Sequence, residues 1–487
     1  MKIKNVYIKN FRGIGELDSP IELLDFNIFI GDNSTGKTAI LEAINYCLSP
    51  GYIASRLDIN DFHNGSQDDI EITVEFDSNF TAKLADGFTT QSVECNKITL
   101  LAKKRERSAP GKAFSDLVTT THYVVPVSAK GTEGWSQSRK GGSDFKFTER
   151  QLALSNVDVE IPRAFYFSKT RNRQLTTGYN SSLTNIVNDL NWRFDKSQRD
   201  KEDADHFKHE RKKLHEKVMS ETGGDTLKKT IDSANEILEK LEIDKIDISL
   251  LKTLTPYDHT EIVFPFDGFE LPVEHSGSGI EMTIAIALLE AMAKISKEKI
   301  LLIIDEPELH LHPKLQGKLF EHLKEIAGEI QIVASTHSPI LFKNVYQNPD
   351  IKLLISKKED NKISIHDARA SGFGLLKWSP SWGEICYFAY GHSTTEFLDD
   401  LYSTIEDNLK TSPTQKISQE DTENWLVSKG QTKEIKWTAT GGSSQEETLM
   451  TYVRNRIHHS DNQSRPIYTP EQLQESIERM VTLLKNP

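Results

Sequence analysis

Residues 31–38 read GDNSTGKT and lie between the apolar run FNIFI and the segment AILEAINYCL, whose apolar residues recur at helical spacing. The octapeptide matches GxxxxGK[ST] between a strand and a helix, the setting in which backbone N–H groups surround phosphate oxygens. Lys37 can neutralise the β- and γ-phosphates, and the Thr38 hydroxyl can ligate Mg²⁺. The stretch therefore predicts a site for ATP and Mg²⁺ made of Gly31, Asn33, Ser34, Thr35, Gly36, Lys37 and Thr38.

A later strand pattern ends in two carboxylates. KILLIIDEP covers residues 299–307, and its apolar part is followed directly by Asp305 and Glu306. A carboxylate at the end of a buried strand can hold Mg²⁺, and its neighbour can polarise an attacking water molecule. We therefore expect Asp305 to share the metal ion with Thr38, and Glu306 to be a catalytic carboxylate.

Two more segments suit the same chemistry. VASTHSP at 333–339 places His337 after the next strand, where an imidazole could reach a γ-phosphate. HSGSGIEM at 275–282 places Ser278 and Gly279 ahead of a helix, whose N-terminal end attracts anions. These segments predict His337 as a second catalytic residue and Ser278 and Gly279 as further nucleotide contacts.

Composition limits the classes of protein to which the chain can belong. With 487 residues, two or three domains are expected, and a net charge of −13 argues against a general binder of polyanions. No apolar stretch reaches 18 residues, and the N-terminus MKIKNVYIKNFRG is a strand pattern, so a cytoplasmic protein without a membrane segment is expected. The three unclustered cysteines rule out a disulfide framework and a cysteine-only zinc site.

The order of patterns predicts an α/β protein with four parts. Strands, several of them antiparallel, and the GDNSTGKT loop fill residues 1–180, and a highly charged helical hairpin is expected over 181–242. Alternating strands and helices return over 243–360, and a mainly helical domain follows over 361–487. The first and third parts would form one ATPase head, with the hairpin as an insertion.

The segment 96–150 reverses the acidic balance of the chain, with 11 Lys and Arg against 5 Asp and Glu. Two interpretations stay open. Solvated loops explain the composition, and so does a surface that contacts DNA.

The order NFRGI, GDNSTGKT, HSGSGIEM, LLIIDEPELHLHP and STHSP resembles the ABC-type ATPase head of the RecF/SMC/OLD-like group, in particular its compact AAA15-type members. The resemblance covers about residues 1–345. It implies homo-oligomers built from head-to-head dimers that enclose ATP, with Lys37 of one head facing Ser278 and Gly279 of the other. It also implies that Glu306 is the catalytic carboxylate and His337 the switch histidine.

The sequence departs from this family at two positions. Ser34 replaces a glycine of the loop, and Ile280 stands where the signature LSGGQ/E has a glycine. The departures favour a slow, sensory ATPase over a fast motor. His310 and His312 in ELHLHP invite a metal interpretation, but their i,i+2 spacing without a third ligand makes it weak.

The tail after residue 345 has none of the strand-end Glu-Gly and Asp-x-Asp patterns that a metal-dependent Toprim nuclease requires, because clustered carboxylates must hold its metal. Asp399 and Asp400 fit a solvated helix face. In TYVRNRIHHSDN, Arg454, His458 and His459 fit the spacing of HEPN-type ribonucleases, in which an arginine and a histidine could cleave RNA. The motif is short, and polar residues that cap a helix or bind a partner explain it more readily.

The tail also resembles the C-terminal region of ATPase subunits from Septu-type and retron-associated anti-phage systems, with PARIS-type ATPase subunits as competitors. The Septu resemblance implies a separate HNH nuclease as partner, and the PARIS resemblance implies a Toprim nuclease. Three hypotheses follow: a regulatory ATPase of an anti-phage complex, an ATPase-controlled HEPN ribonuclease, and a RecF/SMC-like DNA-repair ATPase.

Overall fold

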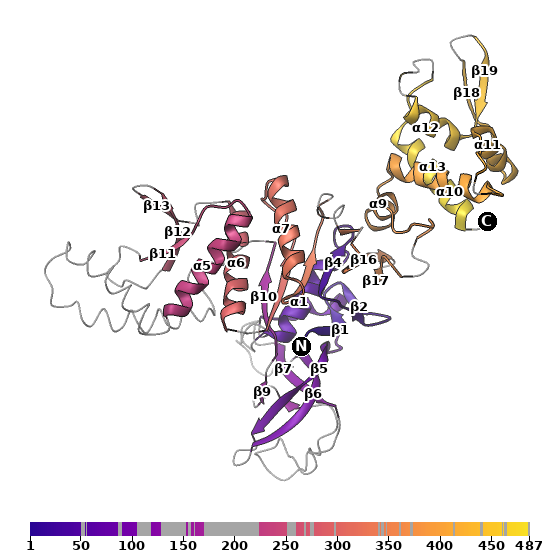
Figure 1. Cartoon of the computed structure of the whole chain (residues 1–487). Coiled ribbons are helices and arrows are strands. Elements are labelled where there is room, and N and C mark those ends of the chain that lie inside the picture. The colour runs from indigo at the N-terminus through magenta and orange to yellow at the C-terminus, as the bar shows by residue number, and fades with distance from the viewer. Residues whose placement is uncertain are drawn as a thin grey trace. The chain divides into compact units, whose positions relative to one another are not determined.

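The computed structural model describes two compact units, Met1–Ile28 with Thr38–Phe342, and Phe29–Lys37 with Lys343–Pro487. The residues described are 1–49, 54, 56–85, 90–104, 118–127, 152–153, 157–159, 161–169, 224–250, 260–266, 269–272, 277–296, 299–338, 341, 345–346, 348–359, 362–370, 374–412, 414–438, 442–459, 461 and 465–485. The chain passes from one unit to the other inside a strand, directly after the GDNSTGK segment, and again after Phe342. Figure 1 labels the helices and strands along the chain.

An antiparallel sheet opens the first unit, in the order β2-β1-β5-β6-β7-β8, with β3 paired to β1 and β9 to β5. Its alternating burial along β1 reflects the period of two that the sequence shows. The expected antiparallel strands are therefore confirmed. Their bounds are β1 (Ile3–Phe11), β2 (Ile14–Glu16), β3 (Ile21–Glu22), β5 (Ile70–Ala85), β6 (Thr90–Lys104), β7 (Val118–Pro126), β8 (Leu152–Ala153) and β9 (Val157–Val159), and two short 3-10 helices, Ile59–Asp61 and His63–Gly65, precede β5.

A second, parallel sheet in the first unit places the strand ends that matter for chemistry. β10 (Arg163–Phe167) pairs in parallel with β14 (Ile300–Asp305), and β14 pairs in parallel with β15 (Gln331–Ser335). Every residue of β14 and β15 is buried, as continuous apolar runs predict for parallel strands. The first residues of β4 (Phe26–Ile30) adjoin β15, since the Asn27 side chain donates to the Ile332 carbonyl over 3.1 Å.

The first unit also contains the helices that carry the motifs. They are α1 (Lys37–Leu48), α5 (Gly224–Lys240), α6 (Ser278–Ser296) and α7 (Pro313–Ile326). α5 and α6 share a buried apolar cluster with a small sheet of β11 (Asp247–Leu250), β12 (Thr260–Phe266) and β13 (Phe269–Pro272) beside it. Of the hairpin expected over 181–242, residues 181–223 lie outside the described residues, and α5 falls in the remainder.

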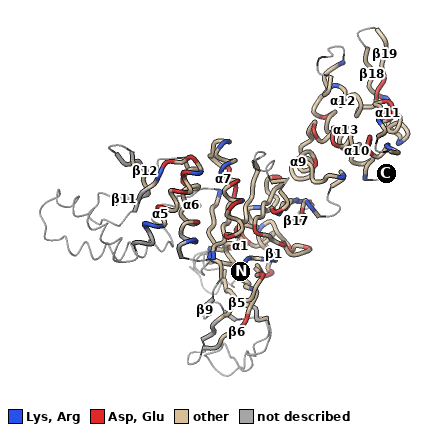
Figure 2. Tube along the Cα trace, viewed as in Figure 1, with Lys and Arg blue, Asp and Glu red and all other residues tan. Residues whose placement is uncertain are grey.

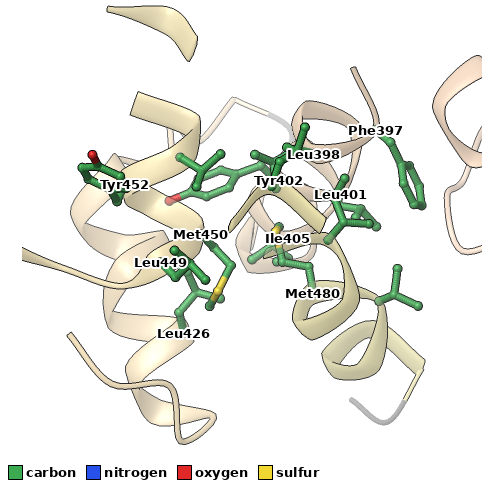
Figure 3. Close-up of a cluster of buried hydrophobic side chains, with 14 of the residues drawn as sticks. Phe397, Leu398, Leu401, Tyr402, Ile405, Leu426, Leu449, Met450, Tyr452 and Met480 are labelled. Atoms are coloured by element: carbon green, nitrogen blue, oxygen red, sulfur yellow. The ribbon is translucent and has the colours of Figure 1, made fainter. Parts of the chain in front are cut away.

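The second unit contains the end of β4 and the antiparallel strands β16 (Ile351–Glu359) and β17 (Lys362–Asp367). Its helices are α9 (Trp382–Tyr390), α10 (Thr395–Leu409), α11 (Gln419–Ser428), α12 (Leu449–His458) and α13 (Pro470–Lys485). Figure 3 shows their shared core, which includes Leu401, Tyr402, Met450 and Met480. The mainly helical tail is thus present. The hairpin of β18 (Ile435–Thr438) and β19 (Ser444–Glu447) was not expected, because the apolar alternation of β18 spans only four residues and β19 is wholly polar.

The helix expected at the C-terminus is confirmed in detail. Thr469 accepts from the Gln472 N–H over 3.3 Å, and the Gln472 side chain accepts from the Thr469 N–H over 2.9 Å, with Pro470 as the first helical residue. The predicted boundaries at 180, 242 and 360 remain predictions. Among the helices within the described ranges, none combines the length and the apolar character needed to cross a bilayer.

Candidate nucleotide-binding site

The GDNSTGK part of the loop follows β4 in the second unit. Gly31 has φ +145°, and a Cβ there would overlap the Ser356 carbonyl oxygen, so this position requires glycine. The buried Lys37 ammonium donates to the carbonyl oxygens of Gly31 and Asp32, each over 2.8 Å. The loop backbone therefore wraps around the lysine side chain. Ser34, which replaces the family's glycine, has the left-handed φ of 61° that glycine adopts at lower cost.

Thr38 and Asp305 meet in the first unit, although 267 residues separate them. The Thr38 hydroxyl donates to Asp305 Oδ2 over 2.8 Å, and the Ser335 hydroxyl donates to Asp305 Oδ1. Asp305 is 1% exposed, and Ser335 is fully buried at the end of β15. The two residues predicted to hold the metal ion are thus neighbours.

Glu306 and His337 lie beyond the ends of adjacent strands. The Glu306 N–H donates to the Ser335 carbonyl over 3.1 Å, and Glu306 has a left-handed φ of 55°. This backbone conformation is costly for a residue with a side chain and is typical of functional sites. The His337 Nε2 lies 3.9 Å from Glu306 Oε1, and both side chains remain partly exposed. The structure therefore brings together the two residues predicted to be catalytic.

Glu308 is a site residue that the sequence reasoning missed. Its Oε1 accepts from the His337 backbone N–H over 2.7 Å, and the residue is 9% exposed. Burial, together with the charge of Glu306, raises the pKa of Glu308, while hydrogen bonds from His337 and Thr336 oppose the shift. No sequence pattern distinguishes this glutamate after DEP. Its contact with His337 depends on the parallel pairing of β14 and β15, which the sequence does not show.

The predicted signature segment begins α6. Gly279 is buried, and a Cβ added there would lie 2.6 Å from Leu311 Cδ2 and 2.9 Å from the His310 carbonyl oxygen. The start of α6 therefore packs closely against the loop that joins β14 to α7, and Ser278 is the first residue of the helix. Whether Ser278 and Gly279 contact a nucleotide stays a prediction.

The two histidines of ELHLHP have different positions. His310 is exposed with φ 64°, whereas His312 caps α7, its Nδ1 accepting from the Lys314 N–H over 3.3 Å. This capping role gives His312 a structural explanation. Within the described parts of the chain, no group of three or more His, Cys, Asp or Glu side chains is arranged to hold a metal ion.

The basic segment 96–150 lies largely outside the described residues. Its described lysines are engaged within their own unit: Lys97 pairs with Glu75 over 3.5 Å, Lys103 pairs with Asp69 over 3.1 Å, and Lys104 donates to backbone carbonyls. The DNA contact stays a prediction.

The C-terminal motif lies on α12 and faces α10, along which acidic residues recur (Figure 2). His458 Nε2 lies 2.9 Å from Asp399 Oδ1. The Arg454 guanidinium stacks on the Tyr402 ring at 4.9 Å and lies 3.9 Å from Glu406. His459 is the C-cap of the helix. Arg454 and His458 thus share a helix face, as their spacing predicts, and each has an acidic neighbour.

Comparison with known proteins places the chain among ATPases. A family model described as "AAA ATPase domain" matches residues 1–342. The chain is 23% identical to the OLD nuclease of Thermus scotoductus, over 74% of this chain and 63% of that protein. It is 22% identical to the Septu protein PtuA of Bacillus thuringiensis, over 77% of this chain and 81% of that protein. A solved Smc head domain from Pyrococcus furiosus aligns with a TM-score of 0.45 and 13% identity, over 75% of this chain and 95% of that chain. The expected relationship to OLD-like and Septu-type ATPases is confirmed.

Proposed function

The chain belongs to the AAA ATPase domain family, and from this membership we propose that it binds ATP with Mg²⁺, hydrolyses it, and thereby controls a partner nuclease in an anti-phage complex. One observation carries the nucleotide part of the proposal. Thr38, which follows the loop lysine, donates a 2.8 Å hydrogen bond to the strand-end carboxylate of Asp305. A hydroxyl and a carboxylate so placed are the ligands that nucleotide-bound Mg²⁺ requires.

Each residue then has a role in hydrolysis. Lys37 and the N–H groups of the loop would hold the β- and γ-phosphates, while Thr38 and Asp305 would hold the metal ion. Glu306 orients and polarises the attacking water, and His337 donates to the γ-phosphate as charge develops there. Bound Mg²⁺ would neutralise negative charge on the phosphates.

A second copy of the chain completes the site in this proposal. Ser278 and Gly279 at the start of α6 would face Lys37 of the other head, so that ATP joins two heads. ATP occupancy would favour one head arrangement, and loss of the nucleotide or an invader signal would shift the population. To invert such an equilibrium nearly completely, the nucleotide must prefer one state by about 5.5 kcal/mol. The left-handed Ser34 and the Ile280 substitution support slow turnover.

The partner nuclease is proposed to bind the C-terminal helices. The relatives include a nuclease and a Septu protein, and the chain spans 63% of the length of the first and 81% of the second. α9 to α13 share one buried core, which suits a separate binding module. An HNH nuclease is the favoured partner and a Toprim nuclease the alternative, which the neighbouring reading frame would decide.

A second candidate function is an intrinsic ribonuclease. The observation that favours it is the 2.9 Å contact between His458 and Asp399, because a carboxylate beside an imidazole can hold it ready for proton transfer. The ion pairs of Arg454 with Glu406 and of His458 with Asp399 also suit a purely structural link between α10 and α12.

The test compares the full-length protein with Lys37→Ala and Glu306→Gln variants. The rate of phosphate release from ATP should fall by about 10²-fold or more in both variants. Lys37→Ala removes the charge that stabilises the phosphates, and Glu306→Gln removes the group that activates water. Glu321→Ala, an exposed carboxylate on α7, is the matched control and should hydrolyse ATP normally. Unchanged turnover in both site variants would contradict the proposal. Adding the purified partner nuclease, with and without ATP, then tests the regulatory part.

A further inference from the structure

Glu308 lies in the loop after β14 and contacts the backbone of the segment that carries His337. Its Oε1 accepts from the His337 N–H over 2.7 Å, across 29 residues of sequence. The glutamate is 9% exposed, and Leu311 in the same loop is 7% exposed, so the loop is anchored on its buried side. The contact therefore fixes where the backbone of His337 lies relative to the end of β14.

This position matters because His337 and Glu306 must act on the same group. Their side chains are 3.9 Å apart at Nε2 and Oε1. The backbone of Glu306 is already held, since its N–H donates to the Ser335 carbonyl. The backbone N–H of His337 is held by Glu308. A displacement of about 1 Å in an active site can cost as much as 10²-fold in rate.

We propose that Glu308 is a positioning residue for ATP hydrolysis. It holds the His337 backbone, so that the imidazole stays close enough to the Glu306 carboxylate for both to act on the same phosphate group. The inference rests on the proposed function. It adds a residue that neither binds nucleotide nor transfers a proton in that proposal. Gln316 provides a weaker second tie, because its amide accepts from the Ser338 hydroxyl over 3.0 Å and donates to the Leu311 carbonyl over 3.0 Å.

The chemistry of the contact predicts which substitutions preserve it. Only one acceptor oxygen of Glu308 meets the His337 N–H, so the negative charge is not needed for the hydrogen bond. Burial already disfavours the charged form. Glutamine keeps an acceptor oxygen at the same reach, whereas aspartate is one methylene too short and alanine has no acceptor. Glu308→Gln should therefore behave like the natural protein, and Glu308→Asp like Glu308→Ala.

The experiment is a double-mutant cycle in the full-length protein, with kcat and the KM for ATP measured for Glu308→Ala, His337→Ala and the double variant. We expect Glu308→Ala to lower kcat by about 10- to 100-fold and to leave KM within about twofold, because the phosphate-binding loop is untouched. We expect the double variant to be no slower than His337→Ala alone, because Glu308 acts through His337. Glu321→Ala is again the matched control.

Three outcomes would overturn the inference: an additive double variant, a change confined to KM, or equal losses in Glu308→Gln and Glu308→Ala. If Glu308→Ala does not fold, Glu308→Asp takes its place in the cycle. The proposed function is judged separately. If Glu306→Gln abolishes hydrolysis while Glu308→Ala leaves kcat unchanged, only the positioning role fails. If Glu306→Gln has no effect, the ATPase site itself is wrong.

Discussion

The strand-end site of the first unit and the Arg454–His458 motif of the second unit differ in how their polar side chains are held. Asp305 is 1% exposed and bonded to two hydroxyls, and Glu308 is buried against the His337 backbone. Arg454 and His458, with side chains 27% and 45% exposed, each contact one partly exposed carboxylate. Burying a charge is costly unless it is fully partnered. The buried network therefore indicates chemistry, whereas the exposed pairs have an adequate structural explanation.

The largest effect should come from the centre of the buried network. Asp305→Asn keeps the shape of the side chain but removes the charge proposed to hold Mg²⁺, so ATP turnover should fall by about 10²- to 10³-fold. The measurement is phosphate release across a range of Mg²⁺ concentrations. Asp407→Asn, an exposed carboxylate of α10 paired with Lys410, is the control. Full activity in Asp305→Asn would remove the functional contrast between the two regions.

The sequence predicted which residues of the buried network lie together, because these residues follow local rules. Glycine at 31, lysine at 37 and carboxylates after an apolar strand each have a short-range pattern, and parallel pairing brings their strand ends to one edge. Glu308 escaped prediction because its partner is a backbone N–H on another strand. The β18–β19 hairpin was not predicted because Ile435 and Trp437 alternate with polar residues over four residues only, and β19 has no apolar residue.

The helical core of the second unit allows a test of stability that is separate from the ATPase site. Leu401 is fully buried among the side chains of α10, α12 and α13 (Figure 3), so Leu401→Ala should cost about 2–5 kcal/mol in free energy of unfolding. Urea denaturation followed by circular dichroism measures the loss. Val427→Ala, an exposed apolar residue on α11, should cost far less. Equal losses would show that this core does not stabilise the unit.

A buried ion pair in the first unit predicts that the free energy of unfolding depends on pH. Glu290 on α6 is 2% exposed and contacts His322 and Lys294, each over 2.6 Å. Burial alone would raise the pKa of Glu290, but the hydrogen bonds of His322 and Lys294 outweigh it and lower the pKa below 4.5. The charged carboxylate of Glu290 therefore stabilises the fold above pH 4.5. This stabilisation is lost as the pH falls through the lowered pKa of Glu290.

Glu290→Gln should accordingly lower the free energy of unfolding by about 1–3 kcal/mol at neutral pH. The difference from the natural protein should shrink as the pH falls well below 4.5, because both side chains are then neutral. Thermal melts at several pH values measure it, with Glu321→Gln as an exposed control. A difference that stays constant with pH would refute the assigned role of the charge.

Ser34 offers a smaller effect at the phosphate-binding loop. Its φ of 61° costs about 1–2 kcal/mol for a residue with a side chain, while glycine loses about 0.5–1 kcal/mol more conformational freedom on folding. Ser34→Gly should therefore stabilise the protein by less than about 1 kcal/mol, seen as a small rise in Tm. Asn33→Gly, next to it in the loop, should not stabilise. ATP turnover measured in parallel tests the slow-switch prediction, which an unchanged rate in Ser34→Gly would contradict.

The smallest effect is expected for the Arg454–His458 motif, although its sequence suggested a catalytic site. Arg454→Ala and His458→Ala should each cost less than about 1 kcal/mol in stability, because partly exposed ion pairs contribute little. Neither should change ATP turnover, since neither residue belongs to the proposed nucleotide site. Cleavage of single-stranded RNA by the natural protein, lost in both variants and in His459→Ala, would instead make this exposed pair a catalytic site. Loss of nuclease control with no RNA cleavage would assign the same face of α12 to partner binding.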